Sequence, residues 1–184
     1  MDGSQIYCVH DRGVEGGIMM KLIVFSDSHR RNSSDMLVII DEEKPDAVLH
    51  LGDVVDDADD IRSVYPDLKV YNVRGNNDYG WRAQDVQDNL IVCAGQVKLF
   101  LTHGHLYGVR RNTKALAAAA RRHDCQMALY GHTHEAEIDR DGGILIANPG
   151  SISLPYVAAP PSYLRLVIEE TDIQPEIIYL DQKR

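Results

Sequence analysis

Short runs of apolar residues alternate along the chain with longer segments in which polar residues predominate. The runs are four to six residues long, carry many β-branched and aromatic side chains, and most are followed by Asp, Gly or His. Such runs predict buried strands at residues 21–26, 47–51, 69–73, 97–102 and 127–130.

The last third of the chain has a different pattern. Alternating apolar and polar positions predict antiparallel strands at residues 162–170 and 176–181. A turn at residues 140–143 contains two glycines and predicts a hairpin over residues 135–148.

Helices are predicted between several of these strands. Residues 32–44 follow a helical pattern in which Ser33 or Ser34 can cap the N-terminus, and Pro66 ends a second helix over residues 57–65. A third helix over residues 112–123 has an alanine-rich centre and arginines near its C-terminus, both of which favour helix. From residue 20 to residue 184, the pattern predicts one α/β domain with two sheets flanked by helices.

The N-terminal segment has a different composition from the rest of the chain. Residues 1–18 are Gly-rich and aperiodic, and they lack the long apolar core of a signal peptide. We expect them to be a leader outside the fold, disordered or non-native, that comes from an upstream start or from cloning.

Composition limits the classes of partner. The 184 residues are 44% apolar and 26% charged with a net charge of −9, which argues against broad binding to nucleic acid or to an anionic membrane. A small phosphorylated substrate stays compatible with this charge, because bound cations reverse the local sign. Three scattered cysteines predict a reducing, cytoplasmic location. A homodimer is expected only because twofold dimers are common.

Polar clusters follow five of the predicted strands and hold five of the eight histidines. Because ligands in open α/β sheets bind at the carboxyl ends of strands, we expect these clusters to converge. The clusters are Asp27-Ser28-His29, Gly52-Asp53, Arg74-Gly75-Asn76-Asn77-Asp78, His103-Gly104-His105 and Gly131-His132-Thr133-His134.

The donor types and their spacing predict a metal site. In D-x-H and H-x-H, donors two residues apart point the same way in extended backbone. Imidazole and carboxylate donors suit Mn, Fe, Co, Ni or Zn, and two ions separated by about 3.5–4 Å are a known device for phosphoryl displacement. The candidate donors exceed the needs of one tetrahedral ion: Asp27, His29, Asp53, Asn76, His103, His132 and His134.

The order of these motifs, with "NPGS" following at residues 148–151, resembles the calcineurin-like metallophosphoesterase family and its small prokaryotic phosphodiesterase branch. The resemblance implies a four-layer αββα sandwich of two mixed sheets, with the metal site at the C-terminal ends of strands. It also implies two divalent ions, manganese favoured, with iron, nickel, cobalt or zinc as alternatives. One ion would be held by Asp27, His29 and His134, the other by Asn76, His103 and His132, and Asp53 would bridge them.

The same resemblance implies a phosphodiesterase that hydrolyses P–O bonds by attack of a hydroxide shared between the metals, with Asp53, Asn76 and His105 as catalytic residues. Asn77 departs from the pattern G-N-H-[DE] of many relatives, whose histidine is thought to protonate the leaving oxygen. An amide cannot supply that proton at neutral pH, and general-acid help is typically worth about 10²–10⁴-fold. We therefore expect a preference for stabilised leaving groups such as aryl esters. His105 either replaces the acid or orients a ligand.

Other interpretations remain open at the level of sequence. A retromer subunit of the same fold is regarded as a protein-interaction module, so a non-catalytic metal-binding or interaction scaffold is the alternative function. A single-zinc hydrolase would leave several donors idle. Asp78 either bonds a histidine ligand or closes a turn. Tyr79, Trp81 and Arg82 either touch the substrate or form a partly packed surface loop.

Overall fold

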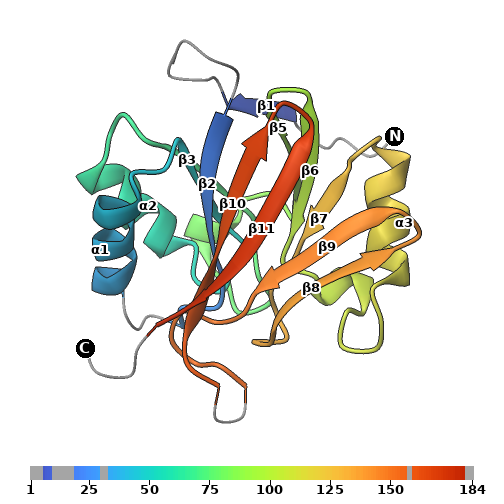
Figure 1. The fold of residues 1–184 in the computed structure, drawn as a ribbon. Helices are drawn as coiled ribbons and strands as arrows, with labels where there is room; N and C mark the ends of the chain where they lie inside the picture. The colour runs from blue at the N-terminus through green and yellow to red at the C-terminus, as the bar shows by residue number, and fades with distance from the viewer. Residues whose placement is uncertain (1–5, 10–18, 30–32, 157–158, 181–184) are drawn as a thin grey trace.

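The computed structural model describes residues 6–9, 19–29, 33–156 and 159–180. Within these residues, eleven strands form two sheets, and helices lie on the outside (Figure 1). In the described part of the chain, no helix combines the length and the apolar character that crossing a membrane requires.

The first sheet is five-stranded and mixed. Its order is β11-β10-β2-β3-β4, in which β2, β3 and β4 are parallel while β10 is antiparallel to both neighbours. The strands are β2 (Met19–Phe25), β3 (Ala47–His50), β4 (Lys69–Asn72), β10 (Ser162–Glu169) and β11 (Asp172–Tyr179).

The second sheet has six strands in the order β1-β5-β6-β7-β9-β8 and is also mixed. Parallel pairing joins β6, β7 and β9, while β8 and β5 pair antiparallel with their neighbours β9 and β6. The strands are β1 (Ile6–Val9), β5 (Asn89–Ala94), β6 (Val97–Thr102), β7 (Met127–Leu129), β8 (Ala136–Asp141) and β9 (Ile144–Pro149).

Three apolar cores hold the layers together. The core between the sheets includes Leu49 and Leu164 from one sheet and Leu99 from the other. Helices α1 (Ser33–Glu43) and α2 (Asp56–Val64) pack on the five-stranded sheet, with Met36 inside that core, while α3 (Lys114–Arg122) packs Leu116 on the six-stranded sheet. The fold is therefore the predicted αββα sandwich with two mixed sheets, and in Figure 1 the helices lie on opposite sides of it.

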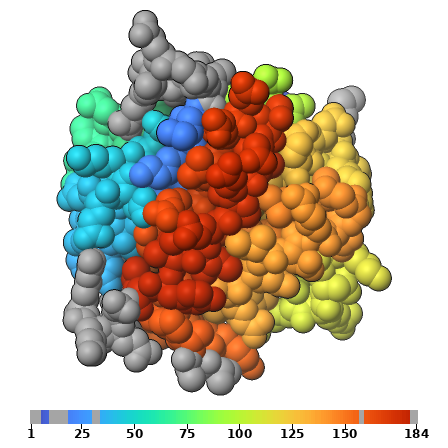
Figure 2. Space-filling view, viewed as in Figure 1, coloured from blue at the N-terminus to red at the C-terminus, as the bar shows by residue number. Residues whose placement is uncertain are grey.

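One face of the molecule shows how the sheets meet the surface. In the space-filling view, strands β10 and β11 occupy the middle of the face, between α1 on one side and β8 and β9 on the other (Figure 2). Successive side chains along β11 mostly alternate between exposed and partly buried positions, as expected for an edge strand.

The N-terminal segment corrects one expectation from the sequence. Residues Ile6–Val9, which were expected outside the fold, form strand β1 and pair in parallel with β5. Val9 lies in the core between the sheets, and the Tyr71 hydroxyl of β4 donates to the Cys8 carbonyl at 3.1 Å. Strand β1 therefore bridges the two sheets on this side. The rest of the proposed leader, residues 1–5 and 10–18, lies outside the described residues.

Register places the strand ends of each sheet at one level. Phe25 pairs with His50, and His50 with Asn72, so β2, β3 and β4 finish side by side. Bonds beyond the strands keep the following loops together: the Asp27 amide donates to the Gly52 carbonyl at 3.1 Å, and the Gly131 amide donates to the His103 carbonyl at the same distance. The polar clusters are thereby brought to one end of the sandwich.

Candidate metal centre

The loops at the strand ends have an unusual backbone. Five of the predicted donors have positive φ without being glycine: Asp27 (57°), His29 (49°), Asp53 (51°), His132 (71°) and His134 (62°). A non-glycine residue in a sparsely populated backbone region costs on the order of 1–3 kcal/mol, and such residues cluster at ligand sites. The surrounding bonds must therefore hold these loops in place.

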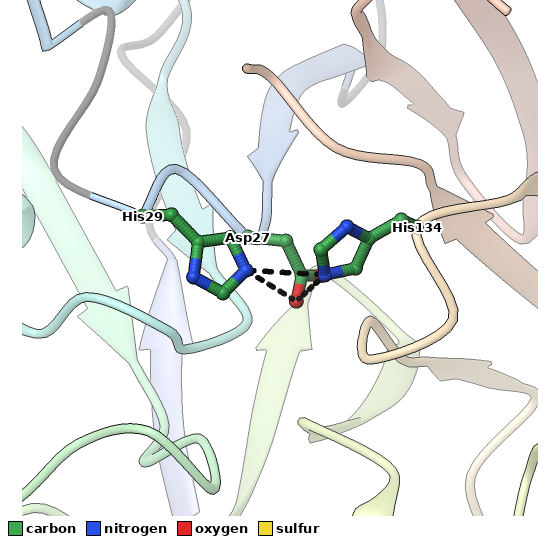
Figure 3. A group of neighbouring side chains, drawn as sticks. All are labelled: Asp27, His29 and His134. Carbon is green, nitrogen blue, oxygen red and sulfur yellow. Dashed lines mark hydrogen bonds and ion pairs between the residues drawn. The ribbon is translucent and has the colours of Figure 1, made fainter. Parts of the chain in front are cut away.

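Asp27, His29 and His134 form the first donor group (Figure 3). The His29 and His134 Nε2 atoms are 3.1 Å apart, and the Asp27 Oδ1 atom lies 3.2 Å from His134 Nε2 and 4.0 Å from His29 Nε2. His134 Nδ1 lies 2.6 Å from the Leu154 carbonyl, to which it donates. This bond leaves Nε2 to face the carboxylate, as in many metal-binding histidines.

The second donor group contains Asp27, Asp53 and His103, all of them buried. His103 Nε2 lies 3.5 Å from Asp53 Oδ2 and 4.0 Å from Asp27 Oδ1. The same nitrogen is 3.1 Å from Asn76 Oδ1, so the amide oxygen joins the group. His103 Nδ1 donates to the Leu51 carbonyl at 2.7 Å, which again directs Nε2 toward the other donors.

His132 and His105 lie beside these groups rather than within them. The His132 ring is 5.2 Å from the His103 ring, but its Nε2 accepts from Arg110 Nε at 3.0 Å. Burial lowers the pKa of His132 to about 4, and the charges of His103 and Arg110 lower it in the same direction. The His105 ring lies 5.4 Å from the His103 ring, and its Nδ1 atom is buried without a hydrogen-bond partner. Sequence reasoning did not identify Arg110, although two consecutive arginines follow the H-G-H loop.

Asp27 is the electrostatic centre of the site. Burial alone would raise the pKa of its carboxyl group, but the contact with His134, the hydrogen bond from Ser26 and the charge of His103 outweigh that effect and hold the pKa below its usual value. The same contact with Asp27 raises the pKa of His134. Asp27 Oδ1 is nevertheless buried without a hydrogen-bond partner.

This donor set fits a divalent cation. Tetrahedral bonds of about 2.0–2.2 Å place neighbouring donor atoms about 3.4 Å apart, within the range of separations seen here. A buried anionic oxygen without a hydrogen-bond partner, surrounded by imidazole nitrogens, is the chemistry that such an ion satisfies.

Two neighbouring segments brace the site. Ser26 Oγ and the His132 amide donate to Asp27 Oδ2 at 2.6 and 3.0 Å. From the "NPGS" segment, Ser151 Oγ donates to the Asp27 carbonyl at 2.6 Å, and Asn148 Nδ2 donates to the Gly131 carbonyl at 3.0 Å. The contact of Ser151 with Asp27 crosses 124 positions of the chain.

The loop after β4 holds Asp53 from the other side. The Asn77 amide donates to Asp53 Oδ1 at 2.8 Å, and Asn77 Nδ2 donates to Asp53 Oδ2 at 2.6 Å. Asp78 accepts from the amides of Gly75, Asp53 and Val55 at 2.7, 2.9 and 3.0 Å. Of the two roles left open by the sequence, Asp78 therefore has that of closing the turn.

The two donor groups share one residue. Asp27 belongs to both groups, whereas Asp53 belongs to the second group only. The seven predicted donors are thus brought to one end of the fold, and Asp27 is the carboxylate they share most closely.

The αββα sandwich with Asp/His donor groups at the ends of its strands defines an α/β class with a candidate metal centre, and comparison with known families identifies the family. The model of the calcineurin-like phosphoesterase superfamily domain matches residues 20–171. The chain therefore belongs to the calcineurin-like phosphoesterase family.

Individual relatives agree with this membership. A probable metallophosphoesterase, YsnB of Bacillus subtilis (strain 168), is 32% identical over 152 residues, which cover 82% of this chain and 85% of the relative. The phosphodiesterase YfcE of Escherichia coli (strain K12) is 36% identical over 105 residues, which cover 52% of this chain and 50% of the relative.

Solved structures share the fold. A predicted phosphoesterase from Streptococcus pneumoniae TIGR4 superposes with a TM-score of 0.70 at 30% identity, covering 88% of this chain and 90% of the other. Vacuolar protein sorting 29 from Cryptosporidium parvum superposes with a TM-score of 0.75 at 21% identity, covering 91% and 94%, and this likeness concerns the fold alone.

Proposed function

We propose that this chain is a phosphodiesterase that depends on two divalent metal ions, with manganese the favoured metal. The observation that supports the proposal best is the pair of adjoining donor groups that share the Asp27 carboxylate. One ion would be held by Asp27, His29 and His134. The other would be held by Asn76, His103 and His132, with Asp53 between the two.

When bound, two such ions lower the pKa of a water and neutralise charge that gathers on the phosphoryl oxygens. The residues of this chain supply the orientation. Carbonyl groups fix the rings of His103 and His134, and Asn77 fixes both oxygens of Asp53. Arg110 offers a guanidinium group beside His132, which can donate to a phosphoryl oxygen.

The proposal includes a preference for good leaving groups. Asn77 is committed to Asp53 through its side-chain amide and cannot supply a proton at neutral pH. The predicted result is a steep fall in kcat/KM from aryl to alkyl phosphodiesters. Comparable rates on the two kinds of leaving group would contradict this preference without contradicting hydrolysis.

We assign His105 an orienting role beside His103 rather than the role of the missing acid. The support is its ring contact with His103 and a pKa that burial lowers, which leaves little imidazolium at neutral pH. His105→Ala should then slow aryl and alkyl diesters by the same factor. A greater loss on alkyl diesters would assign the acid to His105.

The alternative is a non-catalytic scaffold of the same fold, which the likeness to vacuolar protein sorting 29 keeps in view. The decisive experiment measures metal content after purification and then hydrolysis of bis(p-nitrophenyl) phosphate with added Mn²⁺. The enzyme should bind close to two equivalents of metal and hydrolyse the substrate, and Asp27→Asn should bind less metal and lose hydrolysis. Stable metal binding without turnover on any diester would favour the scaffold.

A further inference from the structure

Two aromatic side chains protrude from the loop that follows β4. Tyr79 is 80% exposed and Trp81 is 75% exposed, the two largest fractions among the large hydrophobic side chains of the described residues. Aromatic residues that stay in water at this level, next to each other, mark a surface that binds something.

Tyr79 and Trp81 line a cavity of about 230 Å³, together with Asn77, Asp78 and Arg82 among others. Its walls are ordered by their own contacts. The Arg82 guanidinium carbon lies 5.1 Å from the centre of the Trp81 ring, and Arg82 Nη1 donates to Asp56 Oδ1 at 3.0 Å. Two carboxylates, Asp56 and Asp78, line the cavity beside this single cation, so the cavity favours an uncharged group over a second phosphate.

The cavity adjoins the metal donors. Asn77, one of its walls, donates through its backbone and its side chain to both oxygens of Asp53. Asp78, another wall, accepts from the Asp53 amide. The cavity therefore shares two of its lining residues with the surroundings of Asp53.

We propose that this cavity binds a flat, uncharged aromatic ring of the substrate, such as an aryl group or a nucleobase, stacked on Tyr79 or Trp81. The inference rests on the proposed phosphodiesterase function and names the class of substituent that the site accepts. The cavity is smaller than the ~300–1,000 Å³ that encloses a drug-sized ligand, so it suits a single ring system. Stacking of a base on an aromatic side chain typically strengthens binding by about fivefold to a hundredfold.

The test uses two phosphonates with the same charged group and no scissile ester. Methylphosphonate and phenylphosphonate are compared as inhibitors of bis(p-nitrophenyl) phosphate hydrolysis by the Mn²⁺-loaded protein. Phenylphosphonate should bind at least about fivefold more tightly. Trp81 is the only tryptophan of the chain, so its fluorescence should respond to phenylphosphonate and not to methylphosphonate in the Zn²⁺-loaded protein.

Two variants locate the effect. Tyr79→Ala should remove most of the preference for phenylphosphonate, whereas Tyr179→Ala, a matched change of a 53% exposed tyrosine on β11, should retain it. A phosphonate analogue of a nucleoside monophosphate then separates the two sources of the ring. If it binds more tightly than phenylphosphonate, the ring is a nucleobase, and if it binds less tightly, the ring is a simple aryl group.

The outcomes separate the two proposals. Equal inhibition by the two phosphonates in a protein that hydrolyses diesters would overturn the aromatic pocket and leave the proposed function standing. A preference for phenylphosphonate in the fluorescence titration, lost in Tyr79→Ala, together with absence of turnover, would support the pocket and overturn the proposed hydrolysis. A preference that survives in Tyr79→Ala and in Trp81→Leu would also overturn the pocket.

Discussion

At the scale of single residues, the two carboxylates of the site have different surroundings. Asp27 is shared by both donor groups, and Asp53 is held by both hydrogen-bonding groups of Asn77. If Asp53 bridges the ions, Asp53→Ala should bind one Mn²⁺ instead of two and lose hydrolysis, as measured by calorimetric titration and metal analysis. Two ions bound with unchanged affinity would remove the bridging role from Asp53. Loss of both ions in Asp27→Asn would then give that role to Asp27.

Gly131 provides a second prediction at this scale, because a side chain there would collide with Ser26 Oγ and approach Asp27 Oδ2 to 2.7 Å. Gly131→Ala should displace the Asp27 carboxylate and weaken Mn²⁺ binding by about tenfold or more, since disturbing the groups that orient a metal ligand typically lowers metal affinity by about 10–100-fold. Gly143→Ala is the control, because Gly143 has a φ of +87° but no neighbouring atom within 4 Å. It should lower stability through backbone strain and leave metal affinity unchanged. Equal metal affinity in both variants would contradict the prediction.

The lowered pKa of His132 predicts how the metal-free protein responds to pH. Its folded-state pKa of about 4 lies below the ordinary 6.5, so the unfolded chain binds this proton more readily between these values. The free energy of unfolding should therefore rise with pH across that window and fall as pH drops through it. In denaturation of chelator-treated protein, His132→Asn should make the free energy of unfolding depend less steeply on pH. The change in slope should be smaller than that produced by the uptake of one full proton. Arg110→Gln should narrow this pH window, because the charge of Arg110 helps to lower the pKa of His132. An unchanged slope in His132→Asn would contradict this account.

The candidate donors could be predicted from sequence because each lies within four residues of the end of an apolar run, and these runs end at the same end of the sandwich. Asp27 and Asp53 are examples, and their loops needed only local reasoning. Ser151 and Arg110 could not be found that way, because their contacts with Asp27 and His132 join segments 124 and 22 positions apart. Their role is a property of tertiary structure.

At the scale of elements, the strands that end in polar clusters were predictable, and two members of the six-stranded sheet were missed. Strand β5 runs into β6 through a tight turn at residues 95–96, so no polar cluster marks its end. Strand β1 is four residues long and pairs with a partner more than 80 positions away, which a local pattern cannot reveal.

Strand β1 leads to a stability prediction. Val9 is 4% exposed in the core between the sheets, whereas Ile6 on the same strand is 61% exposed. Val9→Ala should lower the free energy of unfolding by about 1–3 kcal/mol, and Ile6→Ala should change it by less than about 0.5 kcal/mol. Urea denaturation measures both. Equal and small effects would mean that β1 does not contribute to the folded domain.

At the scale of the whole molecule, metal binding should stabilise the fold. An ion that binds only the native state adds RT ln(1 + [L]/Kd), about 2.7 kcal/mol for one site at a hundredfold excess over Kd. For a protein of this size, that corresponds to a rise in Tm of roughly 5–10 °C. Differential scanning calorimetry with and without Mn²⁺ tests it, and Asp27→Asn should reduce the rise. An unchanged Tm at saturating Mn²⁺ in the unaltered protein would contradict native-state metal binding.

The first donor group takes Asp27 and His29 from the five-stranded sheet and His134 from the six-stranded sheet. Any change in the spacing between the sheets therefore alters the distances between the donor atoms of these three residues. Leu164 packs in the core between the sheets, far along the chain from every donor. Its size therefore influences the distances between the metal-binding side chains. Substitutions in this apolar core should then alter substrate turnover, although the substituted side chains contact neither water, metal nor phosphate.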